Sequence, residues 1–295
     1  MRIQGQPTVR KASSQFRGQP LTTKRYWDWS LDAQPNNNLS TAVYDTVLFS
    51  NTEGFGGNGN YLDLPSGFPK AMADMFNGWG RSGGGCVQEG PFIVPNFHVN
   101  IGEANGSSCL RRDFMPGKTA TQTSIEIEIL SLTKHPAILH GDADPKEVQK
   151  VLDQPDFASF DRQIEGEPAW FPPAIHAGGH FGIGGMLGQA GNAANSPGGE
   201  TDSTFFARCL SIILTTIPEP LFYMHHTMID YVYWKWQQID PEVRLHQVGG
   251  PVVPYDYTGT NVTLDFEINL GAIAPSIPLR DTLDTQGGLF CYTYE

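Results

Sequence analysis

The chain has 295 residues, a formal net charge of −12, 39% hydrophobic residues and 17% charged residues. This length and composition fit one large globular domain with enough apolar material for a core. The acidic balance argues against nucleic acid and anionic membranes as partners, because both are themselves negatively charged. No apolar run approaches the length of a membrane span, and the start of the chain lacks the apolar core of a signal peptide.

The first half of the chain contains few clear elements. Residues 1–25 show no amphipathic helical pattern and no histidine, and we treat them as an atypical N-terminus. A short helix is expected within residues 66–79, where methionine and phenylalanine side chains recur on one face. Residues 125–130 alternate as a strand would, but they also fit the start of a helix. A proline in the first turn predicts a further helix over residues 144–152.

The second half has a more regular pattern. Residues 182–199 are rich in Gly, Ala, Asn and Ser, which predicts a long loop. Helices are expected over residues 204–215 and 221–238. After Asp240 the chain turns to extended segments, which predict strands or irregular wrapping. We find no repeat and no linker, so residues 1–295 are expected to form a single domain.

Histidines carry the strongest chemical signal in the chain. His176 and His180 are four residues apart, so on a helix they share a face and their ring nitrogens can reach one ion. A third imidazole is expected from the double histidine at His225 and His226. Imidazole suits copper, zinc, iron and nickel, so the ligands alone do not choose the metal. A His-x3-His pair also arises by chance, but the second segment adds further ordered positions, namely Pro220, Phe222, Asp230 and Trp236.

In this order, residues 175–185 and 218–236 resemble the copper B half of the tyrosinase, catechol oxidase and hemocyanin family, so we assign the copper B region to residues 170–238. The resemblance implies that His176 and His180 are the first two copper B ligands and that His226 is the third. His225 is the alternative for the third position.

Two acidic residues in the second segment also match family positions. Asp230 matches the family's aspartate, which would orient a neighbouring histidine or pair with a nearby base. Glu219 stands where the family usually has aspartate.

Other segments extend the resemblance over nearly the whole chain. Residues 26–32 (Tyr-Trp-Asp-Trp-Ser-Leu-Asp) resemble the segment that follows the family's copper A helices, and residues 86–92 and 109–114 resemble the middle loop of fungal short-chain members. Residues 289–294 resemble the Tyr-x-Tyr motif that closes the catalytic core. The resemblance implies a mainly α fold, with a helical-bundle core, long loops and short strands.

The four cysteines follow no zinc or redox spacing. Cys86 and Cys109 flank one loop and could form a disulfide that closes it. Cys209 is expected to pack as a small hydrophobic residue. Sequons at Asn38 and Asn105, with a third at Asn261, would permit glycosylation in a secreted product, but they do not establish secretion. These features therefore do not assign the protein to a cellular compartment.

The copper A half of the family is missing from its expected place. It uses three further histidines, which should precede Tyr26, yet the first histidine of the chain is His98. We therefore expect the chain to be N-terminally incomplete or to have lost that site. His98 lies in an apparent strand, and the neighbours of His135 and His140 match no ligand motif of this family. His246 is expected at the surface.

The resemblance implies a copper-dependent oxidoreductase that uses dioxygen to oxidise phenols or o-diphenols to o-quinones, with two coppers in the intact family. Ala177 follows the first ligand where some tyrosinases carry an asparagine that helps to deprotonate monophenols, which favours diphenol oxidation here. Ala177 and Phe181 are expected at the substrate entrance. Glu167, nine residues before His176, lies where relatives place a water-holding glutamate.

The missing copper A half leaves other functions open. The main alternative is a degenerate homologue that binds a single metal and acts as a non-catalytic partner or scaffold. A mononuclear enzyme with different chemistry is another, and an oxygen carrier is a third because hemocyanins share these motifs. The physiological phenol and the oligomeric state cannot be derived from the residues.

Overall fold

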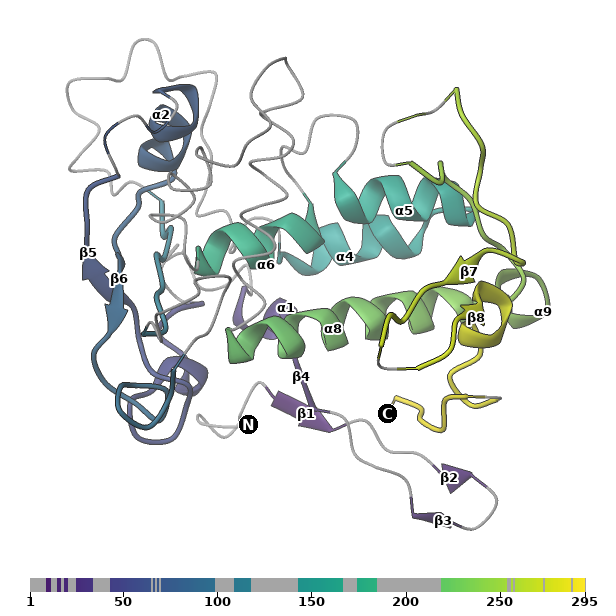
Figure 1. Cartoon of the computed structure of the whole chain (residues 1–295), viewed down its shortest axis with the longest axis horizontal. Coiled ribbons are helices and arrows are strands. Elements are labelled where there is room, and N and C mark those ends of the chain that lie inside the picture. The colour runs from purple at the N-terminus through teal and green to yellow at the C-terminus, as the bar shows by residue number, and fades with distance from the viewer. Residues whose placement is uncertain are drawn as a thin grey trace.

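Four helices form the centre of the computed structural model: α4 (Pro145–Leu152), α5 (Phe157–Glu165), α6 (Ile175–Ile183) and α8 (Pro220–Gln237). The helices α4, α5 and α6 lie along one side of α8, the longest helix (Figure 1). The structure describes residues 9–11, 15–16, 19–20, 25–33, 43–64, 66, 68, 70–98, 109–117, 143–166, 174–184, 219–253, 256, 258–272, 274–287 and 289–294.

The remaining described elements are short. The helices are α1 (Trp29–Asp32), α2 (Lys70–Gly78) and α9 (Pro241–Arg244), with 3-10 turns at Val47–Phe49 and Leu279–Thr282. The strands form antiparallel pairs: β1 (Val9–Lys11) with β4 (Arg25–Trp27), β2 (Gln15–Phe16) with β3 (Gln19–Pro20), β5 (Gly59–Tyr61) with β6 (Gly84–Val87), and β7 (Glu267–Ile268) with β8 (Ile277–Pro278). The expectation of a mainly α fold with short strands is confirmed.

The ends of α4 and α5 follow directly from the sequence. The Asp144 carboxylate accepts a hydrogen bond from the Lys146 backbone N–H at 2.8 Å, and a proline occupies the first turn of α4. The Asp156 side chain caps α5 in the same way by accepting from the Ser159 N–H at 2.8 Å. Gly166, at φ 76°, ends α5 in the left-handed conformation that favours glycine. The helix predicted over residues 144–152 is confirmed.

Helix α8 packs one face against the core and carries the double histidine. The buried residues recur at helical spacing and are Leu221, His225, Met228, Val232 and Trp236. Strand β4 lies across this helix and contributes Tyr26 and Trp27, both fully buried. The predicted helix over residues 221–238 is confirmed, with bounds one residue earlier at each end.

Several local expectations have clear outcomes. The expected helix within residues 66–79 is α2, and the Cys86–Cys109 disulfide is present with 5.5 Å between its Cα atoms. The first residues of the loop predicted over 182–199 belong instead to α6, which Gly184, at φ 73°, ends, and the remainder of that prediction falls outside the described residues. His98 is exposed and lies outside any strand, so that expectation was wrong. The expectations for residues 125–130 and 204–215 and for His135, His140 and Cys209 fall outside the described residues.

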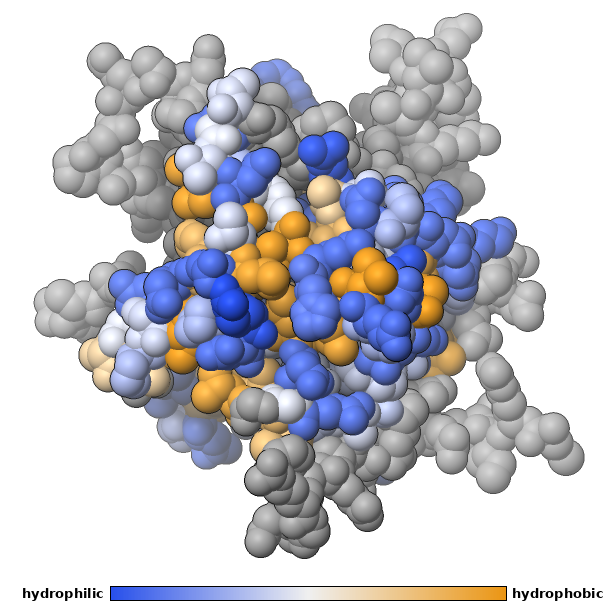
Figure 2. Space-filling model, turned by 90° about the vertical axis from the view of Figure 1, so that its right-hand side faces the viewer, coloured by the Kyte–Doolittle hydropathy of each residue, from blue (hydrophilic) through white to orange (hydrophobic). Residues whose placement is uncertain are grey.

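The C-terminal end of the molecule presents a mixed surface. Figure 2 views the end that carries α9, β7 and β8, where hydrophobic groups are separated by hydrophilic ones. Large exposed hydrophobic side chains in this part of the chain include Ile239, Val243, Val253 and Phe266. Within the described residues, no helix is both long enough and apolar enough to span a membrane.

Candidate metal centre

Four imidazoles gather where α6 packs against α8. His176 and His180 project from α6, and the double histidine belongs to α8. The Nε2 atoms of His176 and His180 lie 3.1 Å apart, and the Nε2 atoms of His180 and His226 lie 3.2 Å apart. Ring nitrogens of His176, His180 and His225 also lie within 4.8 Å of one another. A group of three histidines is therefore available for a metal ion, and distance alone does not say which α8 histidine completes it.

Burial favours the neutral form of three of these imidazoles, those of His180, His225 and His226. Burial first, and then charge repulsion from the other histidines, holds the pKa of His180 well below its usual range. The same causes lower the pKa of His226 to about 4, although the Glu165 carboxylate opposes the shift. The pKa of His225 is likewise well below its usual value, mainly because the ring is buried. Neutral imidazole is the form that binds a metal, so these three rings are in the form needed for coordination near pH 7.

Both ring nitrogens of His225 have hydrogen-bond partners. Its Nε2–H donates to the backbone carbonyl of His176 at 2.9 Å, and its Nδ1 accepts from the Trp29 indole N–H at 3.1 Å. His225 is 3% exposed and Trp29 is 1% exposed, so no bulk water competes for these bonds. Gly179 leaves room for the ring, since a Cβ at that position would lie 2.2 Å from its Cε1 atom.

Glu165, the last residue of α5, contacts the first histidine of the pair. The His176 Nδ1 atom lies 2.8 Å from each carboxylate oxygen of Glu165. An ionised carboxylate only accepts, so the proton sits on Nδ1 and the Nε2 lone pair is free. Carboxylates in this position fix the tautomer of metal-binding histidines and raise their basicity. Sequence reasoning missed Glu165. Glu167, which it expected to hold a water, falls outside the described residues, so that role stays a prediction.

A buried ion pair holds the start of α8. The Arg112 guanidinium forms two hydrogen bonds of 2.8 Å each with the Glu219 carboxylate, and Arg112 is fully buried. The same arginine donates to the backbone carbonyls of Phe55 and Gly57 at 3.0 and 3.1 Å. Glu219 also accepts from the Leu221 N–H at 3.2 Å and so caps the helix. The larger side chain found where the family usually has aspartate thus reaches both the helix end and Arg112.

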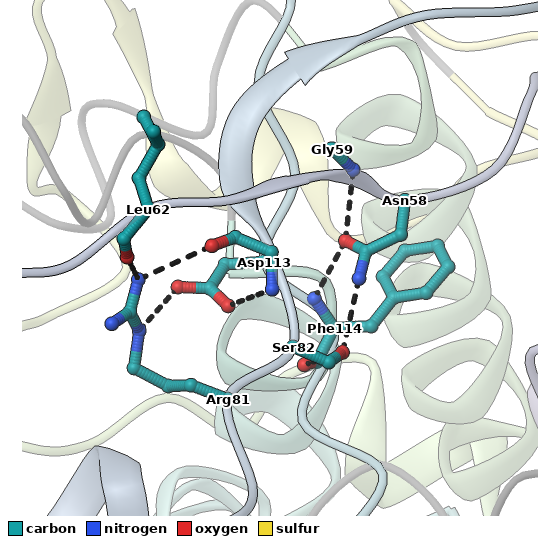
Figure 3. A network of polar contacts seen from close by, with 8 residues as sticks. Asn58, Gly59, Leu62, Arg81, Ser82, Asp113 and Phe114 are labelled. Carbon is teal, nitrogen blue, oxygen red and sulfur yellow. Dashed lines mark hydrogen bonds and ion pairs between the residues drawn. The ribbon is translucent and has the colours of Figure 1, made fainter.

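A second polar network supports the end of α6 (Figure 3). Arg81 donates to the Asp113 carboxylate at 2.5 Å and to the Leu62 carbonyl at 3.0 Å. In the same view, the Asn58 side-chain oxygen accepts from the Phe114 N–H at 3.0 Å. The Asp113 backbone N–H then donates to the carbonyl of Ile183, the last residue of α6. This network joins the loop after α2 to the helix that carries two of the histidines.

The residues predicted around the histidines have different surroundings. Asp230 accepts hydrogen bonds from the hydroxyls of Tyr292, at 2.7 Å, and of Tyr294. The carboxylate therefore ties the C-terminal Tyr-x-Tyr segment to α8, and its predicted effect on a histidine stays a prediction. Ala177 and Phe181 are 7% and 8% exposed.

These two residues pack in a cluster beside α2. The Phe181 ring centroid lies 5.4 Å from that of Trp79 and 6.3 Å from that of Phe76, and Ala177 belongs to the same cluster. The histidine face of α6 is thus turned toward α8, while the next face packs under α2. A role for Ala177 and Phe181 at the substrate entrance stays a prediction. His246 is exposed, as expected.

The fold and these contacts define a class: a helical bundle that gathers imidazoles from facing helices for a metal. Comparison with known proteins gives the family. The family model for tyrosinase, described as the common central domain of tyrosinase, matches residues 10–239. The chain belongs to the tyrosinase family.

Individual relatives are distant. The tyrosinase-like protein phomQ1 of Diaporthe leptostromiformis is 29% identical over 283 residues, which cover 92% of this chain and 56% of that protein. Tyrosinase ustQ of Aspergillus flavus is 28% identical and is covered to 56%. The N-acetyl-6-hydroxytryptophan oxidase ivoB of Emericella nidulans is 23% identical and is covered to 69%. The chain thus spans about half the length of the first two relatives.

A solved structure supports the fold. A variant of the polyphenol oxidase from Thermothelomyces thermophila superposes with a TM-score of 0.58 at 23% identity, covering 92% of this chain and 65% of that one. The family implies copper, and the donor set fits it, because neutral imidazole nitrogens suit copper in both oxidation states that its redox chemistry uses. The expected membership of the tyrosinase family is confirmed.

Proposed function

We propose that this chain is a copper-dependent oxidase of the tyrosinase type, with its metal at the copper B site, and that it uses dioxygen to oxidise phenols or o-diphenols to o-quinones. One observation carries the proposal: the Nε2 atom of His180 on α6 lies 3.1 Å from that of His176 and 3.2 Å from that of His226 on α8. Nitrogen atoms at this separation need an ion between them or shared protons to be stable. Family membership makes copper the ion of choice.

The ligands in this proposal are His176, His180 and His226. His226 is preferred to His225 because both nitrogens of His225 already have protein partners, whereas His226 Nε2 points at His180. His226 is also partly exposed, as expected of a ligand within reach of a small substrate. Copper bound here would supply the one-electron cycling that passes electrons from the phenol to dioxygen.

The protein contributes binding and orientation. Glu165 holds the proton on Nδ1 of His176 and leaves Nε2 free. Phe222 lies against the third ligand, with 4.2 Å between its ring centroid and that of His226, which restricts rotation of that imidazole. The Arg112–Glu219 pair fixes the end of α8 from which the ligand projects. Each contact keeps a ligand in place before the metal arrives.

We assign o-diphenols as the preferred substrates. Ala177 follows the first ligand and has no side-chain amide, so the group that helps some tyrosinases to deprotonate monophenols is missing at this position. An o-diphenol needs no ring hydroxylation. The names of the relatives, which include tyrosinases and a hydroxytryptophan oxidase, support an aromatic hydroxyl compound as the substrate class.

Oxygen uptake tests the proposal directly. Copper-loaded protein is mixed with catechol or with 4-methylphenol in an oxygen electrode, and the quinone is trapped with a coloured nucleophile. We expect uptake with catechol, little with 4-methylphenol, none after His180→Ala, and unchanged uptake after His246→Ala. Copper binding without uptake would overturn the enzyme proposal and support the non-catalytic partner instead.

A further inference from the structure

The two adjacent histidines of α8 stand almost equally close to the metal-binding pair. The ring centroid of His180 lies 5.2 Å from that of His225 and 5.1 Å from that of His226. Ring nitrogens of His176, His180 and His225 lie within 4.8 Å of one another, close enough to share an ion. Proximity therefore does not exclude His225 from the metal, and something else must decide between the two rings.

Hydrogen bonding distinguishes the ring of His225 from that of His226. The Trp29 indole N–H is a donor only and the His176 carbonyl is an acceptor only, so together they fix His225 with Nδ1 unprotonated and the proton on Nε2. The Nδ1 lone pair is directed at Trp29, and the Nε2 position is blocked by its proton. Each partner is enclosed, so breaking either bond leaves a buried polar group without a hydrogen bond, which is unfavourable.

We propose that Trp29 acts as a positioning residue that keeps His225 away from the metal and thereby makes His226 the ligand. The proposal rests on the proposed function, since it assumes that the histidine group binds metal. The hydrogen bonds of the His225 ring then link α1 and α6 to α8, and His226 is left to coordinate the metal. The N-terminal helix α1, which holds no ligand, thus determines the composition of the centre.

The test uses zinc as a diamagnetic probe and reads the histidine nitrogens by long-range 15N–1H NMR. Without metal, the wild-type protein should show His225 in the Nε2–H form. On addition of zinc, the ring nitrogens of His176, His180 and His226 should shift, while those of His225 should not. An Nδ1–H form of His225, or a zinc-induced shift of its ring, would overturn the proposal without requiring any variant.

Trp29→Phe removes the indole N–H and keeps an aromatic ring. We expect His225 to populate both tautomers in this variant and its ring nitrogens to shift on zinc binding. Trp27→Phe is the matched control, because Trp27 is also buried and also donates through its indole N–H, at 2.8 Å, but to Asp32. The control should keep the wild-type pattern at His225.

The outcomes separate the two proposals. If the wild-type protein binds no zinc through these histidines, the metal centre itself is wrong. If zinc binds through His176, His180 and His226 while Trp29→Phe leaves His225 unprotonated at Nδ1 and unaffected by zinc, only the role of Trp29 is wrong.

Discussion

A methyl group added at Gly179 tests the position of the His225 ring. Gly179 lies on α6 between the two histidines of the His-x3-His pair. A Cβ at this position would lie 2.2 Å from Cε1, 2.4 Å from Nδ1 and 2.5 Å from Nε2 of His225. The rigid imidazole must therefore move by roughly 1 Å to restore ordinary contact, which breaks its hydrogen bonds with Trp29 and the His176 carbonyl.

The size of the effect follows from these contacts. Overpacking of a dense site costs about 1–3 kcal/mol, and two lost hydrogen bonds add about 1 kcal/mol each. Alanine recovers about 1 kcal/mol through its better helix propensity. We therefore expect Gly179→Ala to lower the free energy of unfolding by about 2–4 kcal/mol.

Urea unfolding of the metal-free protein, followed by far-UV circular dichroism, measures this change. Gly78→Ala is the matched control, because a Cβ there meets nothing within 4 Å and the residue also lies in a helix. The control should be as stable as the wild type or more stable by up to about 1 kcal/mol. If Gly179→Ala is as stable as Gly78→Ala, the His225 ring does not lie where the argument places it.

Three further changes have defined outcomes. Arg112→Met leaves the Glu219 carboxylate buried without its ion-pair partner, so the free energy of unfolding should fall by about 3–5 kcal/mol. Urea unfolding measures this fall, and a fall no larger than that caused by replacing an exposed lysine would contradict the prediction. Glu165→Ala should weaken copper binding by about 10–100-fold, with partial recovery in Glu165→Gln, whereas Glu242→Ala at an exposed site should bind as the wild type does in a competition titration. The metal-free protein should lose stability as the pH falls from 6.5 toward about 4, because His226 in the unfolded chain then binds a proton that folded His226, with its pKa lowered to about 4, does not. The urea midpoint should therefore change less with pH in His226→Gln than in the wild type. An equal change with pH in both proteins would contradict the lowered pKa of His226.

Local signals in the sequence were enough to predict the framework of the centre. The four-residue spacing of His176 and His180 and the ordered neighbours of the double histidine pointed to two helices, and the structure has both. Caps such as Asp144 with the following proline predicted the start of α4, because capping depends on residues close together in the chain. The disulfide was also predicted, from two cysteines that flank one loop.

Contacts between segments far apart in the chain could not be predicted from the sequence. The Trp29–His225 bond joins residues 196 positions apart, and the Arg112–Glu219 pair joins residues 107 positions apart. Neither contact produces a periodic or short-range sequence pattern from which it could be predicted. Glu165 was missed for a related reason: its contact with the ring of His176 depends on how helix α5 packs against α6, which the residues around Glu165 do not indicate.

Copper retention shows whether the histidines of α6 and α8 hold the metal. The wild-type protein and single alanine variants at His176, His180, His226 and His246 are loaded with copper, dialysed against a weak chelator and analysed for bound metal. We predict that the wild type and His246→Ala keep their copper and that the other three variants lose it. Equal copper in all four variants would contradict the assignment of the centre to these histidines.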